Sequence, residues 1–164
     1  MSTGVSFDVL LAYLDEEAAK WEKWFAENRA AFDVKVDVAN VGDARGMLHH
    51  IFAVEKLYVR RLRHEPPITP NDVPREPDTE LFAVGRQARL DLRAIASEKG
   101  DSGLDESFTF KTLTYGDITA SYRKCLIQVI VHSIRHWAQL ATTLRQAGFK
   151  QPWGHDFLLS TAMK

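Results

Sequence analysis

The sequence predicts an all-α protein, a single four-helix bundle over residues 1–164. Four stretches carry apolar residues at intervals of three and four, which is the period of a helix with one buried face. Together they cover more than half of the chain, far above the helical share of an average globular protein. The length is near that of one domain, which can bury a core without disulfides or a structural metal.

The first two helices are predicted from about Phe7 to Ala31 and from Val41 to His64. Asn40 is the expected N-cap of the second helix, because its side chain can accept a hydrogen bond from a free backbone N–H. Pro66 and Pro67 prevent that helix from continuing. The connection is short, so we expect these two helices to be antiparallel neighbours.

The third helix is predicted to begin after Pro77-Asp78-Thr79 and to end at Gly100, and the fourth to run from about Ser121 to Gly148. Glycine suits the left-handed backbone position that follows a helix end. The proline-rich segment 64–78 is long enough, when extended, to run back along the bundle. We therefore expect the second and third helices to be parallel.

A short β-hairpin is predicted before the last helix. Aromatic residues alternate along Phe108–Leu113, and Tyr115-Gly116-Asp117 follows as a turn. Alternation followed by turn residues is typical of a hairpin.

The charge balance excludes several classes of function. The chain has 21 Lys+Arg and 22 Asp+Glu, so its net charge of −1 gives no field that would attract nucleic acid. No apolar run approaches the length of about eighteen residues that a membrane span needs, and the first residues lack the pattern of a signal peptide. One cysteine permits no internal disulfide. We expect a cytoplasmic protein whose partners include neither nucleic acid nor membrane.

The strongest candidate site is a pair of histidines, His132 and His136, on the predicted fourth helix. Residues four apart lie one turn apart on the same face, which is the spacing that one metal ion requires of a helix. Both lie on the apolar stripe and so face the core. A pair of hydrogen-bonded structural histidines is the alternative interpretation.

His50 on the second helix favours the metal interpretation. It shares the apolar face with Ile51 and Val54, whereas the adjacent His49 falls on a more polar side and is expected to meet solvent or an interface. Three inward histidines would leave coordination positions for water or substrate, as in catalytic metal sites.

The remaining polar candidates have two interpretations each. Glu55 could orient a metal ligand or form an ion pair with an arginine such as Arg123, and Gln139 could bind substrate or cap the core. Cys125 is expected to pack as a small apolar residue instead of acting as a catalytic thiol. His64 is expected to cap the second helix, and His155 to be a solvated tail residue instead of bordering a site.

Three segments together resemble the DinB/YfiT-like superfamily, in which this chain is identified as a DinB family protein. His50–Tyr58 resembles the first motif, His132–Leu140 with its continuation to Phe149 resembles the second, and Pro152–Phe157 is similar to the usual ending. The resemblance extends over nearly the whole chain in order and spacing.

The resemblance implies an up-down-down-up bundle that forms a homodimer and holds a divalent metal ion on His50, His132 and His136. Zinc or nickel is the expected metal, and iron or cobalt would also accept three imidazoles. Many members have a second histidine after the residue that matches His136. Here it is Trp137, whose larger ring would alter the pocket wall or the dimer face.

The resemblance also implies a reaction class, since characterised members activate a low-molecular-weight thiol as cosubstrate. We therefore expect a metal-dependent thiol S-transferase, or a related hydrolase or isomerase, whose small-molecule substrate is an electrophile. A non-enzymatic metal- or ligand-binding stress-response protein is the alternative from another class. An interaction domain with structural histidines is the third.

Overall fold

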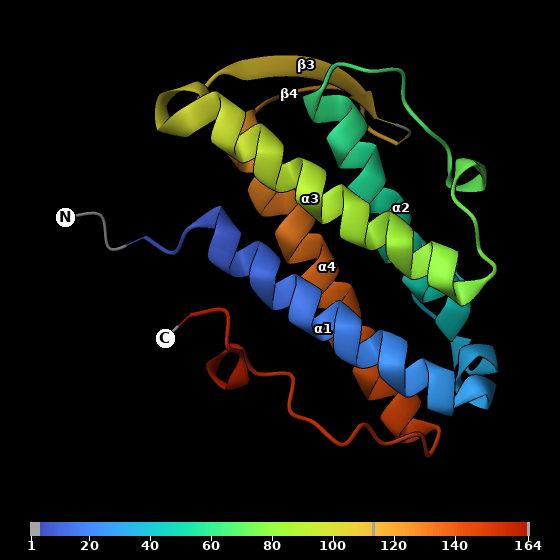
Figure 1. Cartoon of the computed structure of the whole chain (residues 1–164). Helices are drawn as coiled ribbons and strands as arrows, with labels where there is room; N and C mark the ends of the chain where they lie inside the picture. Colours follow the sequence, from blue (N-terminus) through green and yellow to red (C-terminus); the bar gives the residue numbers. More distant parts are fainter. Residues whose placement is uncertain (1–3, 113, 164) are drawn as a thin grey trace.

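The computed structural model describes residues 4–112 and 114–163 and confirms the four-helix bundle. In Figure 1, the first and fourth helices run in one direction and the second and third in the other, so the up-down-down-up order is present. The four helices are α1 (Phe7–Glu27), α2 (Ala44–Leu62), α3 (Asp78–Gly103) and α4 (Tyr122–Gln146). The shorter elements are η1 (Arg29–Asp33), β1 (Lys35–Val36), β2 (Gly42–Asp43), η2 (Pro70–Asp72), β3 (Ser107–Thr112), β4 (Gly116–Ser121) and η3 (Phe157–Leu159).

Helix α1 ends four residues earlier than the periodicity predicted. The Asn28 side-chain amide donates to the Trp24 carbonyl, at 2.8 Å, and so caps the last turn. The chain then continues as η1, a tighter 3-10 turn that buries Phe32. The apolar residues after Glu27 therefore continue the core but not the helix.

Helix α2 also starts later than expected, because its N-cap is Asp43 and not Asn40. The Asp43 carboxylate accepts from the backbone N–H of Gly46 at 2.7 Å. Asn40 instead has a left-handed backbone, with φ of 56°, between the paired strands β1 and β2. The helix ends at Leu62, two residues before the expected His64, whose own φ is 55°.

The ends of α3 and α4 follow the predicted glycine positions closely. The helical backbone of α3 breaks at Gly100, with φ of 61°, and one further turn extends to Gly103. Helix α4 begins after Ser121, whose hydroxyl accepts from Lys124 N–H. Gly148, with φ of 90°, follows its end.

The expected hairpin is present as the antiparallel strands β3 and β4. Phe110 pairs with Ile118 across it, and the Thr112 hydroxyl accepts from Tyr115 N–H in the turn. Leu113, which was counted in the predicted strand, lies outside the described residues. Figure 1 shows the hairpin at the end of the bundle where α2 ends and α4 begins.

The core is aromatic between α1 and α4. Trp21 is fully buried and stacks on Trp137, with ring centroids 5.8 Å apart and planes 11° apart. Phe52 of α2 also packs against Trp137, with the two ring centroids 5.9 Å apart. None of the helices in the described residues combines the length and the apolar composition that a membrane span requires.

Candidate metal centre

Helices α2 and α4 bring His50, His132 and His136 together. One ring nitrogen of each lies within 4.8 Å of the others. The Nε2 atoms of His50 and His132 are 3.1 Å apart. Three nitrogens around a tetrahedral zinc ion, each about 2.1 Å from it, would lie roughly 3.4 Å apart. The cluster is therefore compatible with a divalent metal ion.

The three rings are poised to be neutral at physiological pH. Burial and the neighbouring histidines lower the pKa of His50 to about 4 and that of His132 to about 3. Burial also lowers the pKa of His136. Only the neutral imidazole has a lone pair for a metal, so no proton competes for these ligands near pH 7.

Gln139 contacts His136 directly. Its Oε1 lies 2.7 Å from His136 Nδ1, and because a carbonyl oxygen can only accept, Nδ1 carries the hydrogen. The tautomer that this bond selects leaves the lone pair of His136 on Nε2, toward the cluster. His132 has no such support, since its Nδ1 is buried without a hydrogen-bond partner among the described residues.

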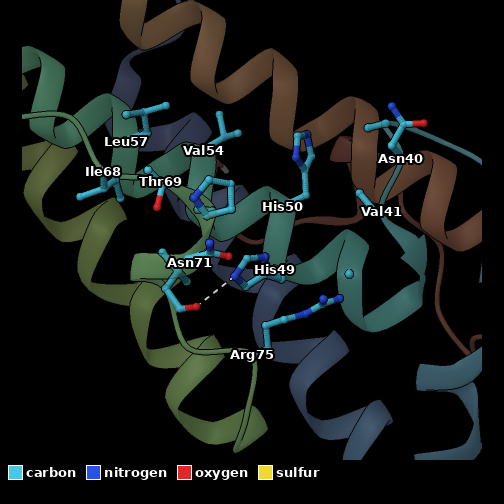
Figure 2. Close-up of a pocket in the computed structure, with 15 residues that line it drawn as sticks. Asn40, Val41, His49, His50, Val54, Leu57, Ile68, Thr69, Asn71 and Arg75 are labelled. Carbon is cyan, nitrogen blue, oxygen red and sulfur yellow. Dashed lines mark hydrogen bonds between the residues drawn. The ribbon is translucent and has the colours of Figure 1, made fainter. Parts of the chain in front are cut away.

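The cluster forms part of the wall of a cleft of about 910 Å³ between α2, α4 and the hairpin. A smaller cleft of about 480 Å³ also reaches His50 and is bounded by the segment 68–75 (Figure 2). The larger cleft is of the size that small-molecule sites have in proteins. An ion on the histidines would thus be accessible to a small ligand.

The prediction that His49 meets solvent or an interface is wrong. Its side chain is buried, and its Nε2 donates to the Val73 carbonyl at 3.0 Å (Figure 2). The segment between α2 and α3 folds back over the polar side of α2 and covers it. His49 therefore anchors this segment and is not one of the three clustered rings.

Glu55 forms an ion pair, but its partner is Arg89 of α3 and not Arg123. The two side chains are fully buried, with Oε2 2.8 Å from Arg89 Nη1. Its other oxygen accepts from the Ser133 hydroxyl at 2.8 Å. Arg123 pairs instead with Asp101 and Asp105 at the surface. Among the described residues, no hydrogen bond joins Glu55 to the three histidines, but Glu55 ties α2 to the turn of α4 that carries two of them.

Trp137 and Cys125 lie on different sides of α4. The Trp137 ring packs in the core toward α1 and takes no part in the wall of the histidine cleft. Cys125 is buried and borders that cleft. Burial raises the pKa of the Cys125 thiol, which disfavours the thiolate that a nucleophile needs.

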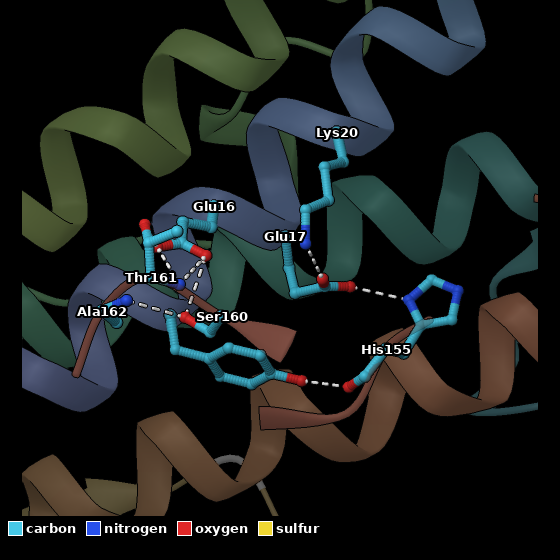
Figure 3. A network of polar contacts seen from close by, with 8 residues as sticks. Glu16, Glu17, Lys20, His155, Ser160, Thr161 and Ala162 are labelled. Atoms are coloured by element: carbon cyan, nitrogen blue, oxygen red, sulfur yellow. Dashed lines mark hydrogen bonds and ion pairs between the residues drawn. The ribbon is translucent and has the colours of Figure 1, made fainter. Parts of the chain in front are cut away.

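His64 and His155 both have defined partners away from the cluster. His64 Nε2 lies 2.6 Å from the Tyr122 hydroxyl, so this ring links the end of α2 to the start of α4. The expectation of a solvated His155 is wrong. Its ring stacks on Trp21 at 5.5 Å, and Nδ1 lies 2.7 Å from Glu17 Oε2 (Figure 3).

The family model for DinB matches residues 1–162. The chain belongs to the DinB family. A search of curated proteins finds no match to this chain.

Three residues of this DinB-family cleft were missed by the sequence reasoning: Arg61, Lys124 and Arg135. A signal was present in their spacing. Arg61 follows His50 by eleven residues, which is close to three whole helical turns. Lys124 precedes His132 by eight residues, an interval that still falls within the stripe that one broad helix face covers. Residues at such intervals share a helix face.

Proposed function

We propose that this protein is a metal-dependent enzyme in which His50, His132 and His136 hold one divalent ion, zinc or nickel in the first place and iron or cobalt otherwise. The convergence of three neutral imidazoles on one point carries the proposal. When bound, such an ion lowers the pKa of a coordinated thiol or water and supplies a nucleophile at neutral pH.

The surrounding residues support a catalytic and not a structural ion. Three protein ligands would leave coordination positions open for water or substrate, and the three histidines line the large cleft. The hydrophobic core includes none of the three histidines, and a chain of this length can bury a core without a structural metal. Gln139 holds the His136 ring in one tautomer, as a group outside the ligand set does in metal enzymes.

We further propose the reaction class, a thiol S-transferase or a related hydrolase or isomerase that acts on a small electrophile with a low-molecular-weight thiol. Membership of the DinB family supports this class. The proposal includes a homodimer in the cytoplasm, with neither nucleic acid nor membrane as partner, in keeping with the net charge of −1.

The proposal is tested by elemental analysis together with a thiol-consumption assay. Wild-type protein should hold about one divalent ion per chain and consume thiol in proportion to metal occupancy. His132→Ala and His136→Ala should lose the ion and keep the helical circular-dichroism spectrum, whereas His64→Gln, a histidine outside the cluster, should lose neither ion nor turnover.

Two results would contradict the proposal. Stoichiometric metal without turnover, across glutathione, bacillithiol and mycothiol with a common electrophile, favours the alternative of a non-enzymatic metal- or ligand-binding stress-response protein. Failure to bind any divalent ion under all loading conditions leaves the histidines with a structural role.

A further inference from the structure

The histidine cleft is lined by three cations. Arg61 comes from α2, and Lys124 and Arg135 come from α4. Among the described residues that line this cleft there is no aspartate or glutamate. Acidic and basic residues are nearly equal in number over the whole chain, so the excess of positive charge is a property of this cleft.

Arg61 is held in place by aromatic rings and not by a carboxylate. Its guanidinium carbon lies 5.0 Å from the ring centroids of both Tyr58 and Phe110. In the part of the chain that the structure describes, Arg61 has no ion pair, and its buried Nε has no hydrogen-bond partner. The nearby Arg60, in contrast, pairs with Glu65 at 2.9 Å. Arg61 is thus oriented while its charge stays uncompensated.

The cations lie at two distances from the histidines. Arg135 is adjacent, with Nη2 3.5 Å from His136 Nε2. The guanidinium of Arg61 stacks on Tyr58, eight residues after His50 and hence about 12 Å along the helix axis. Because α2 and α4 are antiparallel, Lys124 near the start of α4 lies at this same end of the cleft. One positive pole is therefore beside the histidines, and another is about 12 Å away along the axis of α2.

We propose that this cleft binds an extended small molecule with a carboxylate group, which Arg61 and Lys124 hold while the reacting end lies at the histidines. The guanidinium fork matches a carboxylate in geometry and can donate two hydrogen bonds to it. Lys124 and Arg135 are exposed, so Arg61 is the principal ligand. The placement of the reacting end rests on the proposed function, whereas the anion site at Arg61 does not.

The anion site is tested first on metal-free protein, with the dicarboxylates glutarate, adipate and suberate as probes in calorimetry. We expect the longer acids to bind more tightly than glutarate, because they span the two positive poles. Arg61→Gln should weaken the tightest of them at least tenfold. Arg63→Gln removes the same charge two residues away on an exposed side chain outside this cleft and should leave binding unchanged. Equal binding by wild type and Arg61→Gln would overturn the proposal.

The position of the carboxylate is tested on metal-loaded protein with mercaptopropionate, mercaptohexanoate and mercaptooctanoate, each beside the mercaptoalcohol of the same length. The acid should bind at least tenfold more tightly than the alcohol at the longer lengths only, and Arg61→Gln should abolish that preference. If instead the electrophile bears the carboxylate, its KM should rise at least tenfold in Arg61→Gln with an uncharged thiol. A variant that alters neither thiol preference nor electrophile KM contradicts the proposal.

The two proposals can fail separately. Dicarboxylate binding that depends on Arg61, in protein that holds no stoichiometric ion, would support the anion site and refute the metal enzyme. Metal-dependent thiol consumption that is indifferent to Arg61 would do the reverse. Because Arg61 packs between two rings, the melting temperature of each variant is measured. Arg61→Lys keeps the charge and should retain part of the binding if Arg61→Gln is too unstable to assay.

Discussion

The side-chain oxygen of Gln139 lies 2.7 Å from Nδ1 of His136, one turn earlier on the same helix. Within the described residues, this is the one hydrogen bond that a clustered ring donates to a neighbouring side-chain amide. It sets which nitrogen of His136 presents a lone pair to the cluster. The amide therefore prepares the site before any ion arrives.

Replacing this amide should weaken metal binding without removing a ligand. We expect Gln139→Leu to lower metal affinity about 10- to 100-fold, which is the usual effect of losing a partner that orients a ligating histidine. Competition with a chromophoric chelator measures the affinity. Gln146→Leu, on an exposed site of the same helix, is the matched control and should bind like wild type. Equal affinities in all three proteins would show that Gln139 does not orient the ring.

A buried ionic network beneath the cluster should dominate the stability of the bundle. Burial opposes the charge of Arg89, but the carboxylates of Glu55 and Asp15 outweigh it and raise the pKa of the guanidinium. Burial raises the pKa of the Glu55 carboxyl, and Arg89 opposes that rise. Arg89→Met would leave Glu55 buried without its ionic partner, so the free energy of unfolding should fall by about 3–5 kcal/mol. Urea unfolding measures this loss.

The control for that prediction is Arg123→Met, because Arg123 also binds two carboxylates but at the surface. Exposed pairs contribute little, so its effect should be much smaller. The Arg89 variant should also bind metal less tightly, since Glu55 connects α2 to Ser133, which lies between the two α4 histidines. Similar stability losses in both variants would contradict the dominance of the buried network.

Metal-free protein should lose stability as the pH falls below about 6.5. Burial holds the folded-state pKa of His50 at about 4 and that of His132 at about 3, whereas the unfolded chain takes up these protons near pH 6.5. The unfolded state then binds more protons, so the free energy of unfolding decreases by at most about 1.4 kcal/mol per pH unit for each histidine. The loss is fully developed only below the folded-state values.

Urea unfolding between pH 7.5 and 5 measures this dependence, in a range above most carboxylate titration. His132→Asn should reduce the slope, and saturating metal should raise stability most at the upper end of the range. A slope in His132→Asn equal to that of wild type would mean that His132 does not titrate on unfolding as its burial implies.

Local helical spacing was sufficient to predict the histidine cluster, since His132 and His136 share a face by geometry and His50 lies on the apolar face of its own helix. The surroundings of His49 and Glu55 were not predictable in this way. The Val73 carbonyl that covers His49 comes from a connection whose path depends on packing against α2. Arg89, the partner of Glu55, lies on a different helix, and any of several arginines satisfied the pattern.

His155 shows the same limit, because stacking on Trp21 depends on where the chain runs after α4. Its position in a tail predicted exposure, but the segment returns to α1 and forms a polar network there (Figure 3). The Tyr13 hydroxyl donates to the His155 carbonyl, and Glu16 accepts from Ser160 and Thr161. Contacts with one helix thus hold the segment at both of its ends.

This network predicts that Glu17 controls the order of the C-terminal segment. Burial alone would raise the pKa of Glu17, but hydrogen bonds from His155 and Lys20 outweigh it and lower the value, so the group is a carboxylate near pH 7. Glu17→Gln should cost about 1.5–3 kcal/mol, as expected for a lost hydrogen bond to a charged group. Hydrogen–deuterium exchange should become faster in residues 155–161, while the α2 and α4 amides around the histidines stay protected. Glu27→Gln, exposed on the same helix, should change neither. Unchanged exchange in Glu17→Gln would mean that the ring stack on Trp21, and not the carboxylate, holds the segment against α1.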